Sequence, residues 1–364
     1  MKPQEKIAEM EAFMSKAQYN KHTEHGFGVM KAQIARLREK LEKESRKKGG
    51  GHGFAVKKTG DATVILIGFP SVGKSTLLNK LTNAKSEVAA YAFTTLTVIP
   101  GLLEYNKAKI QILDVPGIIS GAAAGRGRGT EVLAMVRNCD LVLFVIDALN
   151  PEQFDALKKE LFDVNVRVNQ NPPDVKIAKK ERGGLSITST VRLTKITKET
   201  IAGILRELRI NNADVVLRSD VDIDQFIDAI EGNRKYVPGV VVVSKIDLVN
   251  QEQQSHIEKT IRPDLLVSAQ TGLNMEELKE EIFTRLKFMR IYLKEVNKKA
   301  DLDEPMIVRE GTVVRDICNR IHRDFVKKFR FCRVWGKSAK FPGQQFVLLD
   351  KQLQDGDILE IHVQ

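Results

Sequence analysis

The sequence GFPSVGKS (68–75) follows the apolar run TVILIG (63–68) and precedes a stretch of helical pattern at 74–82. It fits G-x-x-x-x-G-K-[ST], and its position between a strand and a helix distinguishes a phosphate-binding loop from a chance glycine-rich turn. The backbone N–H groups of such a loop wrap phosphates at the helix N-terminus. We expect the following residues to bind nucleotide phosphates: Gly68, Phe69, Pro70, Ser71, Val72, Gly73, Lys74, Ser75 and Thr76.

The roles of two residues in this loop follow from their chemistry. Lys74 is expected to reach the β- and γ-phosphates, and Ser75 is expected to ligate Mg²⁺. Asp114-Val115-Pro116-Gly117 closes another apolar run about 40 residues later. An Asp at this position can hold Mg²⁺ through a water molecule, and Gly117 can turn its N–H toward the γ-phosphate.

A switch threonine is expected in the segment YAFTTL, between the loop and Asp114. Such a residue caps Mg²⁺ and senses the γ-phosphate. We favour Thr95, with Thr94 as second choice; a pair of strand-favouring threonines is the alternative. The candidate catalytic residues are therefore Lys74, Thr95 and Gly117, and the candidate metal ligands are Ser75 and Thr95.

Base recognition is predicted at SKID (244–247), where GTPases with this loop carry N-K-x-D. The Asp247 carboxylate can accept hydrogen bonds from guanine N1–H and the 2-amino group, a donor pair that adenine lacks. Ser268 and Ala269 occupy the downstream S-A position, where a backbone N–H meets guanine O6. Ser244, Lys245, Asp247, Ser268 and Ala269 complete the expected nucleotide site. Ser244 is shorter than Asn, so we expect it to lose contacts to the phosphate-binding loop and to the base.

Hydrolysis is expected to be slow without assistance. Ile118 follows DVPG, where Ras-like GTPases place a Gln that orients the attacking water. The following glycine-rich stretch carries Arg126 and Arg128. Either arginine is a candidate for approach to the γ-phosphate, although stabilising this segment or a partner contact is the favoured role.

The fold class is predicted to be α/β, with a doubly wound parallel sheet. Apolar runs alternate with helical patterns, as in such sheets. The further runs lie at 109–114, 141–147, 240–244 and 265–269, and the further helical patterns at 129–137, 151–163 and 274–293.

Three further segments surround this G domain, which is predicted to span 60–289. Residues 1–50 are expected to form a basic helical hairpin with narrow apolar stripes, which buries little alone and should dock on another part of the protein. An α+β insert is predicted at 164–237. Residues 290–364 are expected to form a β-grasp, ubiquitin-like module in the order strand, helix and three strands.

The net charge of +11 lies at the two ends of the chain. Residues 1–60 carry +7 and residues 287–364 carry +5, whereas 61–286 carry −1. The basic flanks predict a polyanionic partner such as RNA, and two solvated faces are the alternative. Arg320, Arg323 and Lys327 would share one face of a single helix. Trp335 is expected either to stack on a base or to anchor the small sheet.

Composition excludes several other classes of protein. No apolar run approaches the roughly 20 residues of a membrane span, and the N-terminus lacks the apolar region of a secretory signal. The three cysteines are widely spaced, which argues against a zinc ribbon or a disulfide scaffold. We expect a monomeric cytoplasmic protein.

GFPSVGKST, AAYAFTTLTVIPG and ILDVPGIISGAAAGRGRG resemble the developmentally regulated GTP-binding proteins, which are Obg-related GTPases. The similarity covers essentially the whole chain. The resemblance implies an insert similar to ribosomal protein S5 domain 2, a C-terminal TGS domain and a translation-linked role on ribosomes. Ser244 departs from the family's N-K-x-D. Some relatives use K⁺ to assist hydrolysis, so the resemblance makes K⁺ a candidate cofactor beside Mg²⁺.

Three functions remain open from the sequence. The first is a Mg²⁺-dependent GTPase switch that binds GTP and GDP and acts on ribosomes or RNA, with an acidic or helical protein as a further candidate partner. The second is an ATPase of the YchF type, against which Asp247 argues. The third is a scaffold that binds RNA or protein without hydrolysis, against which Lys74, Ser75 and Asp114 argue.

Overall fold

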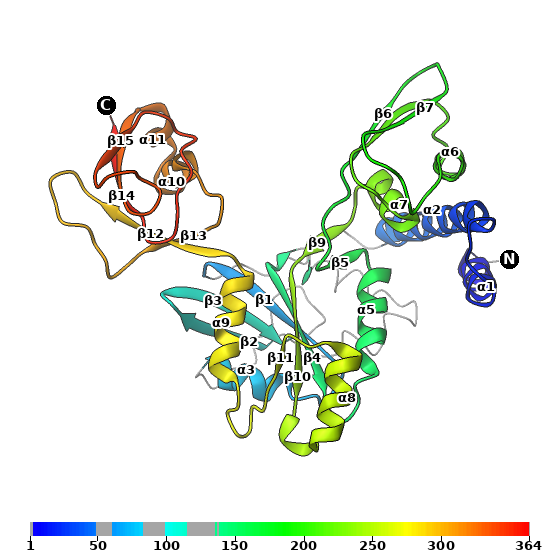
Figure 1. Ribbon diagram of the computed structural model, residues 1–364, viewed down its shortest axis with the longest axis horizontal. Coiled ribbons are helices and arrows are strands. Elements are labelled where there is room, and N and C mark those ends of the chain that lie inside the picture. The colour runs from blue at the N-terminus through cyan, green and yellow to red at the C-terminus, as the bar shows by residue number, and fades with distance from the viewer. Residues whose placement is uncertain (1–2, 49–59, 83–98, 115–134, 137, 364) are drawn as a thin grey trace. The chain divides into compact units, whose positions relative to one another are not determined.

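The computed structural model describes residues 3–48, 60–82, 99–114, 135–136 and 138–363 (Figure 1). The chain divides into two compact units. One comprises Met1–Gly53 and Asn165–Tyr236, and the other comprises Phe54–Val164 and Val237–Gln364.

The second unit contains a six-stranded sheet in the order β11-β10-β4-β1-β3-β2. All neighbouring strands are parallel except β2, which runs antiparallel to β3. The strands are β1 (Ala62–Ile67), β2 (Ile99–Tyr105), β3 (Ala108–Asp114), β4 (Leu141–Asp147), β10 (Gly239–Ser244) and β11 (Leu265–Leu266). The helices of this sheet are α3 (Lys74–Thr82), α5 (Gln153–Asp163), α8 (Gln251–Ile261) and α9 (Met275–Arg285).

Helices cover both faces of this sheet, which explains why its central strands β1, β4 and β10 are buried at every position. In Figure 1, α3 and α9 lie on one side of the sheet, and α5 and α8 lie on the other. Leu78 of α3 and Leu278 of α9 share a buried cluster with Val64 and Leu143 of the strands. On the opposite face, the Phe144 ring meets the Phe154 ring of α5 edge to face. The α/β prediction is confirmed.

The first unit joins the N-terminal hairpin to the segment between Asn165 and Tyr236. Its helices are α1 (Pro3–Lys16), α2 (Glu24–Lys48), α6 (Lys198–Glu207) and α7 (Ile223–Glu231). A three-stranded sheet in the order β6-β8-β7 is formed by β6 (Val175–Lys179), β7 (Leu185–Ser189) and β8 (Ala213–Leu217). Short strands β5 (Val166–Val168) and β9 (Lys235–Val237) pair where the segment begins and ends.

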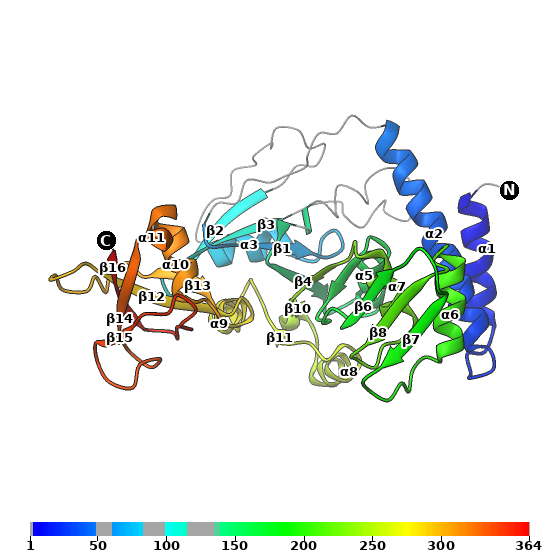
Figure 2. The same ribbon diagram turned by 90° about the horizontal axis from the view of Figure 1, so that it is seen from above.

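The hairpin docks on α6 and α7, as its narrow apolar stripes require. Figure 2 shows α1 and α2 side by side, with α2 along α6. Phe27 and Ala32 of α2 belong to the buried cluster of this unit. A Cβ at Gly28 would lie 2.7 Å from Thr200 Cγ2, so glycine permits the close approach of α2 to α6. The predicted docking is confirmed.

The C-terminal segment forms a five-stranded sheet in the order β13-β12-β16-β14-β15. Its strands are β12 (Phe288–Lys294), β13 (Met306–Arg309), β14 (Phe329–Trp335), β15 (Gln344–Phe346) and β16 (Ile358–Val363). Helices α10 (Val314–Ile321) and α11 (Arg323–Lys327) cover one face. Buried Ile317 and Cys318 of α10 pack with Cys332, Val334 and Leu359 of the strands.

The structure corrects two predictions for this region. The helix predicted over 274–293 ends at Arg285, Lys287 takes a positive φ of 52°, and 288–294 is strand β12. Two strands, not one, therefore precede the helical part of the module. The single helix expected through Arg320, Arg323 and Lys327 breaks at His322, whose φ of −164° and ψ of 141° are extended. The shared face predicted for these three residues is therefore wrong.

Strand β2 and the polar helix α8 were not predicted from the sequence. The helix predicted at 129–137 lies largely outside the described residues. Among the described helices, none has the length and apolarity needed to cross a membrane.

Candidate nucleotide-binding site

The loop from Gly68 to Ser75 joins the end of β1 to the start of α3, as predicted. A Cβ at Gly68 would lie 2.3 Å from the carbonyl oxygen of Val145, so only glycine fits beside β4. Gly73 has a φ of +93°, in the region that favours glycine. These two glycines let the loop turn tightly before α3, and the N-terminus of a helix offers unpaired backbone N–H groups to an anion.

Lys74 lies across this loop with only 8% of its surface exposed. Its ammonium group donates to the carbonyl oxygens of Gly68, at 2.9 Å, and Phe69, at 2.8 Å. Burial lowers the pKa of Lys74, and the nearby Asp114 carboxylate opposes that shift. An ammonium has three N–H donors. Two of these donors are directed to loop carbonyls. A phosphate that approaches the ammonium would compensate for the hydration that burial has removed.

Ser75 and Asp114 form the second part of the site. The Ser75 hydroxyl donates to Asp114 Oδ2 at 2.6 Å. The other carboxylate oxygen, Oδ1, is buried and has no hydrogen-bond partner among the described residues. An unpaired buried carboxylate oxygen beside a hydroxyl is a hard oxygen donor set of the kind that Mg²⁺ prefers. The residues present therefore fit a magnesium ion.

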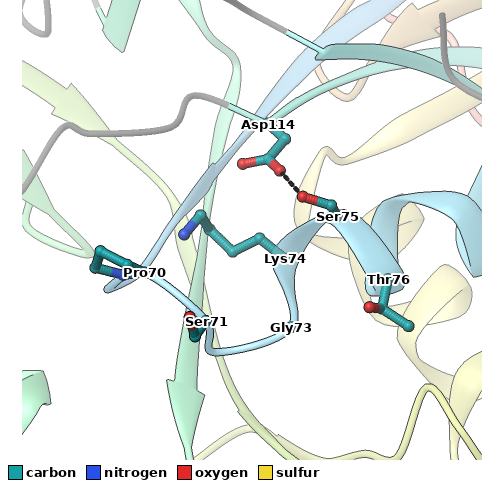
Figure 3. A pocket seen from close by; sticks show the side chains of 7 residues that line it. All are labelled: Pro70, Ser71, Gly73, Lys74, Ser75, Thr76 and Asp114. Atoms are coloured by element: carbon teal, nitrogen blue, oxygen red, sulfur yellow. Dashed lines mark hydrogen bonds between the residues drawn. The ribbon is translucent and has the colours of Figure 1, made fainter. Parts of the chain in front are cut away.

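These groups line one pocket of about 400 Å³ (Figure 3). Figure 3 shows Lys74 lying along the turn from Pro70 to Gly73, with the Asp114–Ser75 pair beside it. The lining residues are Pro70, Ser71, Gly73, Lys74, Ser75, Thr76 and Asp114. The volume falls within the range of small-molecule sites, and the Lys74 ammonium and the hydroxyl groups of the lining suit phosphate.

Ser244 ties the end of β10 to this loop. Its hydroxyl oxygen lies 2.7 Å from the carbonyl oxygen of Val72 and 3.0 Å from that of Ile146. Ser244 is only 4% exposed. The expected loss of a contact to the loop backbone is therefore wrong, because a serine at this position is long enough to reach it. Its one hydroxyl hydrogen is directed to carbonyl oxygens and is not available to a base.

Lys245 makes a second contact to the phosphate-binding loop. With a left-handed φ of 59°, it directs its ammonium group to the carbonyl oxygen of Ser71, at 2.8 Å, and to Asp147 Oδ2, at 2.7 Å. Asp147 ends β4 and is nearly buried, and its Oδ1 accepts the N–H of Leu149 at 3.0 Å. The sequence reading missed Asp147. The available signal was an acidic residue at the end of the otherwise apolar run LVLFVID, which would have marked Asp147 as a polar group at the carboxyl edge of the sheet.

The predicted base-reading residues lie beyond β10 and β11. Asp247 is exposed in the short helix η1 (Ile246–Leu248). Ser268 is buried, and its hydroxyl accepts the N–H of Thr271 at 3.2 Å, which holds the turn that begins after β11. Ala269 follows in that turn and is partly exposed. Asp247 thus presents a carboxylate to solvent beside Lys245, which is already tied to the phosphate-binding loop.

Several predicted residues lie outside the described residues: Thr94, Thr95, Gly117, Ile118, Arg126 and Arg128. Their assignment to the metal, the γ-phosphate or the attacking water stays a prediction.

Comparison with known proteins adds three family matches. Residues 63–180 match the model of a 50S ribosome-binding GTPase domain, and 182–288 match the C-terminal region of that domain. Residues 289–363 match the TGS domain.

Similar proteins span nearly the whole chain. An uncharacterized GTP-binding protein of Methanocaldococcus jannaschii is 54% identical over 98% of this chain and 92% of its own length. The developmentally-regulated GTP-binding protein 2 homolog of Dictyostelium discoideum is 44% identical over 98% of each chain. The solved structure of the Schizosaccharomyces pombe YchF GTPase covers 84% of this chain and 99% of its own, with 13% identity and a TM-score of 0.44.

Proposed function

Because this chain belongs to the family of developmentally regulated GTP-binding proteins, we propose that it is a Mg²⁺-dependent GTPase that hydrolyses GTP slowly and associates with ribosomes or RNA. The observation that carries this proposal is the pocket at the end of β1, where Lys74, Ser75 and Asp114 converge. A phosphate chain fits there because backbone N–H groups, an ammonium and a hydroxyl lie within one loop.

The metal is proposed to be Mg²⁺, held by Ser75 and, through water, by Asp114, with Thr95 as a further ligand. When bound, the ion neutralises charge on the β- and γ-phosphates. Lys74 is proposed to contact the same phosphates, and Gly117 is proposed to sense the γ-phosphate. K⁺ is a candidate for assisting hydrolysis, tested by comparing turnover in KCl and NaCl.

Guanine is proposed as the base because Asp247 is exposed at the end of the segment that Ser244 and Lys245 tie to the phosphate-binding loop. The backbone at Ser268 and Ala269 is proposed to complete the base site. A lost carboxylate contact to a base is worth about 2 to 5 kcal/mol, so GTP should bind far more tightly than ATP. Calorimetric titration with both nucleotides is the test, and equal affinities would contradict a guanine site. Asp247→Asn should let xanthine nucleotides compete.

Hydrolysis is proposed to be slow because Ile118 has no group that orients water. The expected rate is on the order of 10⁻⁴ to 10⁻² per second, measured in a single turnover of purified protein with Mg²⁺. Lys74→Ala and Ser75→Ala should abolish turnover. A fast rate without a partner would point to an additional catalytic group, and Arg126→Ala and Arg128→Ala would then be measured first.

Ribosome or RNA association is proposed from the basic charge at both ends of the chain, +7 in 1–60 and +5 in 287–364. Each phosphate that is neutralised releases counterions, so binding should weaken steeply with salt, with a log–log slope of about −0.7 to −0.9 per contact. Because the tail helix breaks at His322, α11 alone presents Arg323 and Lys327 to solvent.

The test is co-sedimentation of the full chain with ribosomes across a salt series. Arg323→Glu with Lys327→Glu removes the α11 charges, and Lys21→Glu with Lys40→Glu removes hairpin charges. If neither variant changes the salt slope, the basic flanks do not hold the protein on RNA. An acidic or helical protein partner would then be the remaining candidate for these surfaces.

A further inference from the structure

The six-stranded sheet of the G domain carries three aspartates in equivalent places at its amino edge, where the parallel strands begin. Asp61, Asp140 and Asp264 come directly before β1, β4 and β11. The Oδ2 atom of each accepts a backbone N–H of a neighbouring strand, at 2.7 to 2.9 Å. The Oδ1 atom of each faces an arginine. Each carboxylate therefore joins the edge of the sheet to a second element.

Arg285 shows what this arrangement does within the G domain. It is the last residue of α9, and its Nη2 lies 2.5 Å from Asp264 Oδ1. Its Nη1 donates to the carbonyl oxygen of Gly239, the first residue of β10, at 3.3 Å. One guanidinium thus ties the end of a helix to the starts of two strands, which fixes α9 at this edge of the sheet.

The other two arginines belong to the C-terminal module, which is the five-stranded sheet with α10 and α11. Arg309 is the last residue of β13, and its guanidinium donates to Asp140 Oδ1. Arg320 of α10 places Nη2 3.5 Å from Asp61 Oδ1, and its Nη1 donates to the carbonyl oxygen of Ile307 in β13. The module and the G-domain sheet belong to the same compact unit. Two ion pairs therefore link β13 and α10 to the starts of β4 and β1.

Apolar contacts attach the module at a further place. Only Leu286 and Lys287 separate α9 from β12, so the module begins directly at the end of α9. Phe288, the first residue of β12, meets the Phe283 ring of α9 edge to face, with centroids 5.7 Å apart. Phe288 and Ile307 lie in strands of the module but belong to the buried cluster of the G-domain sheet. Attachment at Phe288 permits rotation about the turn at Lys287, and the two ion pairs oppose that rotation.

The ion pairs respond to the solvent differently from the apolar contacts. The Arg309 and Arg320 side chains are 56% and 50% exposed, whereas those of Asp140 and Asp61 are 9% and 19% exposed. Salt screens the attraction between exposed charges, and each such pair contributes little alone. Burial of apolar surface is not screened in this way. We therefore expect the ion pairs to hold the module at low ionic strength and to be lost as ionic strength rises.

We propose that Arg309 and Arg320, paired with the two aspartates, form a latch that fixes the orientation of the C-terminal module on the amino edge of the G-domain sheet and opens as ionic strength rises. With the latch open, the module stays attached at Phe288 and pivots at Lys287. The latched strands β1 and β4 carry the phosphate-binding loop and Asp147 at their other ends. The module is thus held by strands of the nucleotide site at the ends remote from it. The latch depends neither on GTP hydrolysis nor on RNA association.

The distance between two spin labels measures the latch in the full chain. The three native cysteines are buried, so labels attach to cysteines introduced by Glu280→Cys on α9 and Lys337→Cys after β14, both exposed sites. Double electron–electron resonance is recorded at about 0.1 M and about 1 M NaCl, between which the screening length falls from about 10 to about 3 Å. We expect a narrow distance distribution at the lower salt and a broad one at the higher. A distribution that is broad at both, or narrow at both, would overturn the proposal.

Two double variants with the same change of charge assign the effect to the latch. Arg309→Gln with Arg320→Gln should raise the ratio of open to latched molecules about tenfold at the lower salt, since two exposed ion pairs are lost. The matched control is Arg323→Gln with Lys327→Gln, which removes two exposed cations from α11 and should keep the narrow distribution of the wild type. Equal distributions in the two double variants would overturn the role of the arginines.

Asp140→Asn tests the latch from the side of the G domain. An amide oxygen still accepts the Thr63 N–H, but the charge that attracts Arg309 is lost. The module itself is unchanged, so this variant is decisive even if a substitution on α10 perturbs that helix. It should raise the ratio of open to latched molecules about threefold, whereas Asp155→Asn on the exposed side of α5 should not change it. Equal ratios in the two variants would show that the apolar contacts of β12 and β13 alone hold the module, and the latch would be wrong.

Discussion

The Ser244 hydroxyl oxygen lies 2.7 Å from the carbonyl oxygen of Val72, a residue 172 positions earlier in the sequence. Lys245 reaches the neighbouring carbonyl, that of Ser71, at 2.8 Å. Two consecutive residues at the end of β10 are thus bound to two consecutive carbonyls of the phosphate-binding loop. The segment that carries Asp247 and the loop that carries Lys74 are therefore held together before any nucleotide arrives.

Ser244→Ala should weaken guanine nucleotide binding because it removes the hydroxyl that ties β10 to the Val72 carbonyl of the phosphate-binding loop. One hydrogen bond contributes a net of about 0.5 to 1.5 kcal/mol, so the expected loss is roughly two- to tenfold in Kd. Titration calorimetry with GDP measures it. Ser186→Ala, which removes an exposed hydroxyl on β7 of the other unit, is the matched control. Unchanged affinity in Ser244→Ala would show that the tether is not needed for binding.

Asp147→Asn should also weaken nucleotide binding, although Asp147 is not expected to touch the nucleotide. Its carboxylate holds the Lys245 ammonium at 2.7 Å with only 9% of the Asp147 side chain exposed. A hydrogen bond to a charged group contributes about 1.5 to 3 kcal/mol, and partial exposure of Lys245 reduces that, so we expect roughly tenfold weaker GDP binding. Asp155→Asn on α5, an exposed residue, is the control. Equal effects from the two substitutions would remove Asp147 from the site.

Local sequence patterns predicted the strands that are buried on both faces. β1, β3, β4 and β10 are buried on both faces, so an apolar run was sufficient. The boundary between α9 and β12 was missed because Phe288, Ile291 and Leu293 suit either structure. The left-handed turn at Lys287 decides between them, and lysine carries no sequence signal for it.

In the candidate site, too, local features were predicted and contacts between distant segments were not. Lys74, Ser75 and Asp114 were predicted because the loop and the strand end are local features. The tether from Ser244 to Val72 was predicted wrongly because side-chain length alone does not give the distance between β10 and the loop. The sequence predicted that the N-terminal hairpin docks on another part of the protein, but it did not identify α6 as that part. The contact is not local in sequence, because Glu24 and Thr200 are 176 residues apart.

The Lys74 ammonium should link nucleotide binding to proton uptake at alkaline pH. In the folded protein without nucleotide, burial lowers the pKa of Lys74 below the ordinary lysine value of 10.5. Between the lowered pKa and 10.5, the unfolded chain therefore holds a proton that the folded protein has released. Stability of the free protein therefore rises with pH across that window. Phosphates favour the charged form, so binding takes a proton up there and weakens as pH rises.

Calorimetry in two buffers of different ionisation enthalpy measures this uptake. Lys74→Arg is the control, because a guanidinium stays protonated throughout and should show no linked uptake. The same proton uptake in wild type and Lys74→Arg would assign the effect to another group.

The docked hairpin depends on one buried carboxylate. Glu24, 6% exposed, accepts the backbone N–H of Thr197 at 2.8 Å and the hydroxyl of Thr200 at 2.9 Å. Thr197 is itself the N-cap of α6 and accepts the N–H of Thr200 through its side chain. Glu24 thus joins the first turn of α2 to the first turn of α6, where a negative charge also complements the helix dipole.

Glu24→Ala should release the hairpin from α6 more readily than it unfolds either unit, because the exposed ion pairs that remain, such as Arg36–Glu207 at 2.9 Å, contribute little. Leaving the Thr197 N–H unpaired costs about 1 to 3 kcal/mol, whereas the Thr200 hydroxyl keeps the Thr197 hydroxyl as a partner at 2.8 Å. Hydrogen exchange in α2 should therefore accelerate about tenfold. Exchange in β1 and β4 should not change. Glu9→Ala, on the exposed side of α1, is the matched control. If Glu24→Ala leaves exchange in α2 as slow as in Glu9→Ala, apolar packing around Phe27 and Ala32 alone holds the hairpin in place.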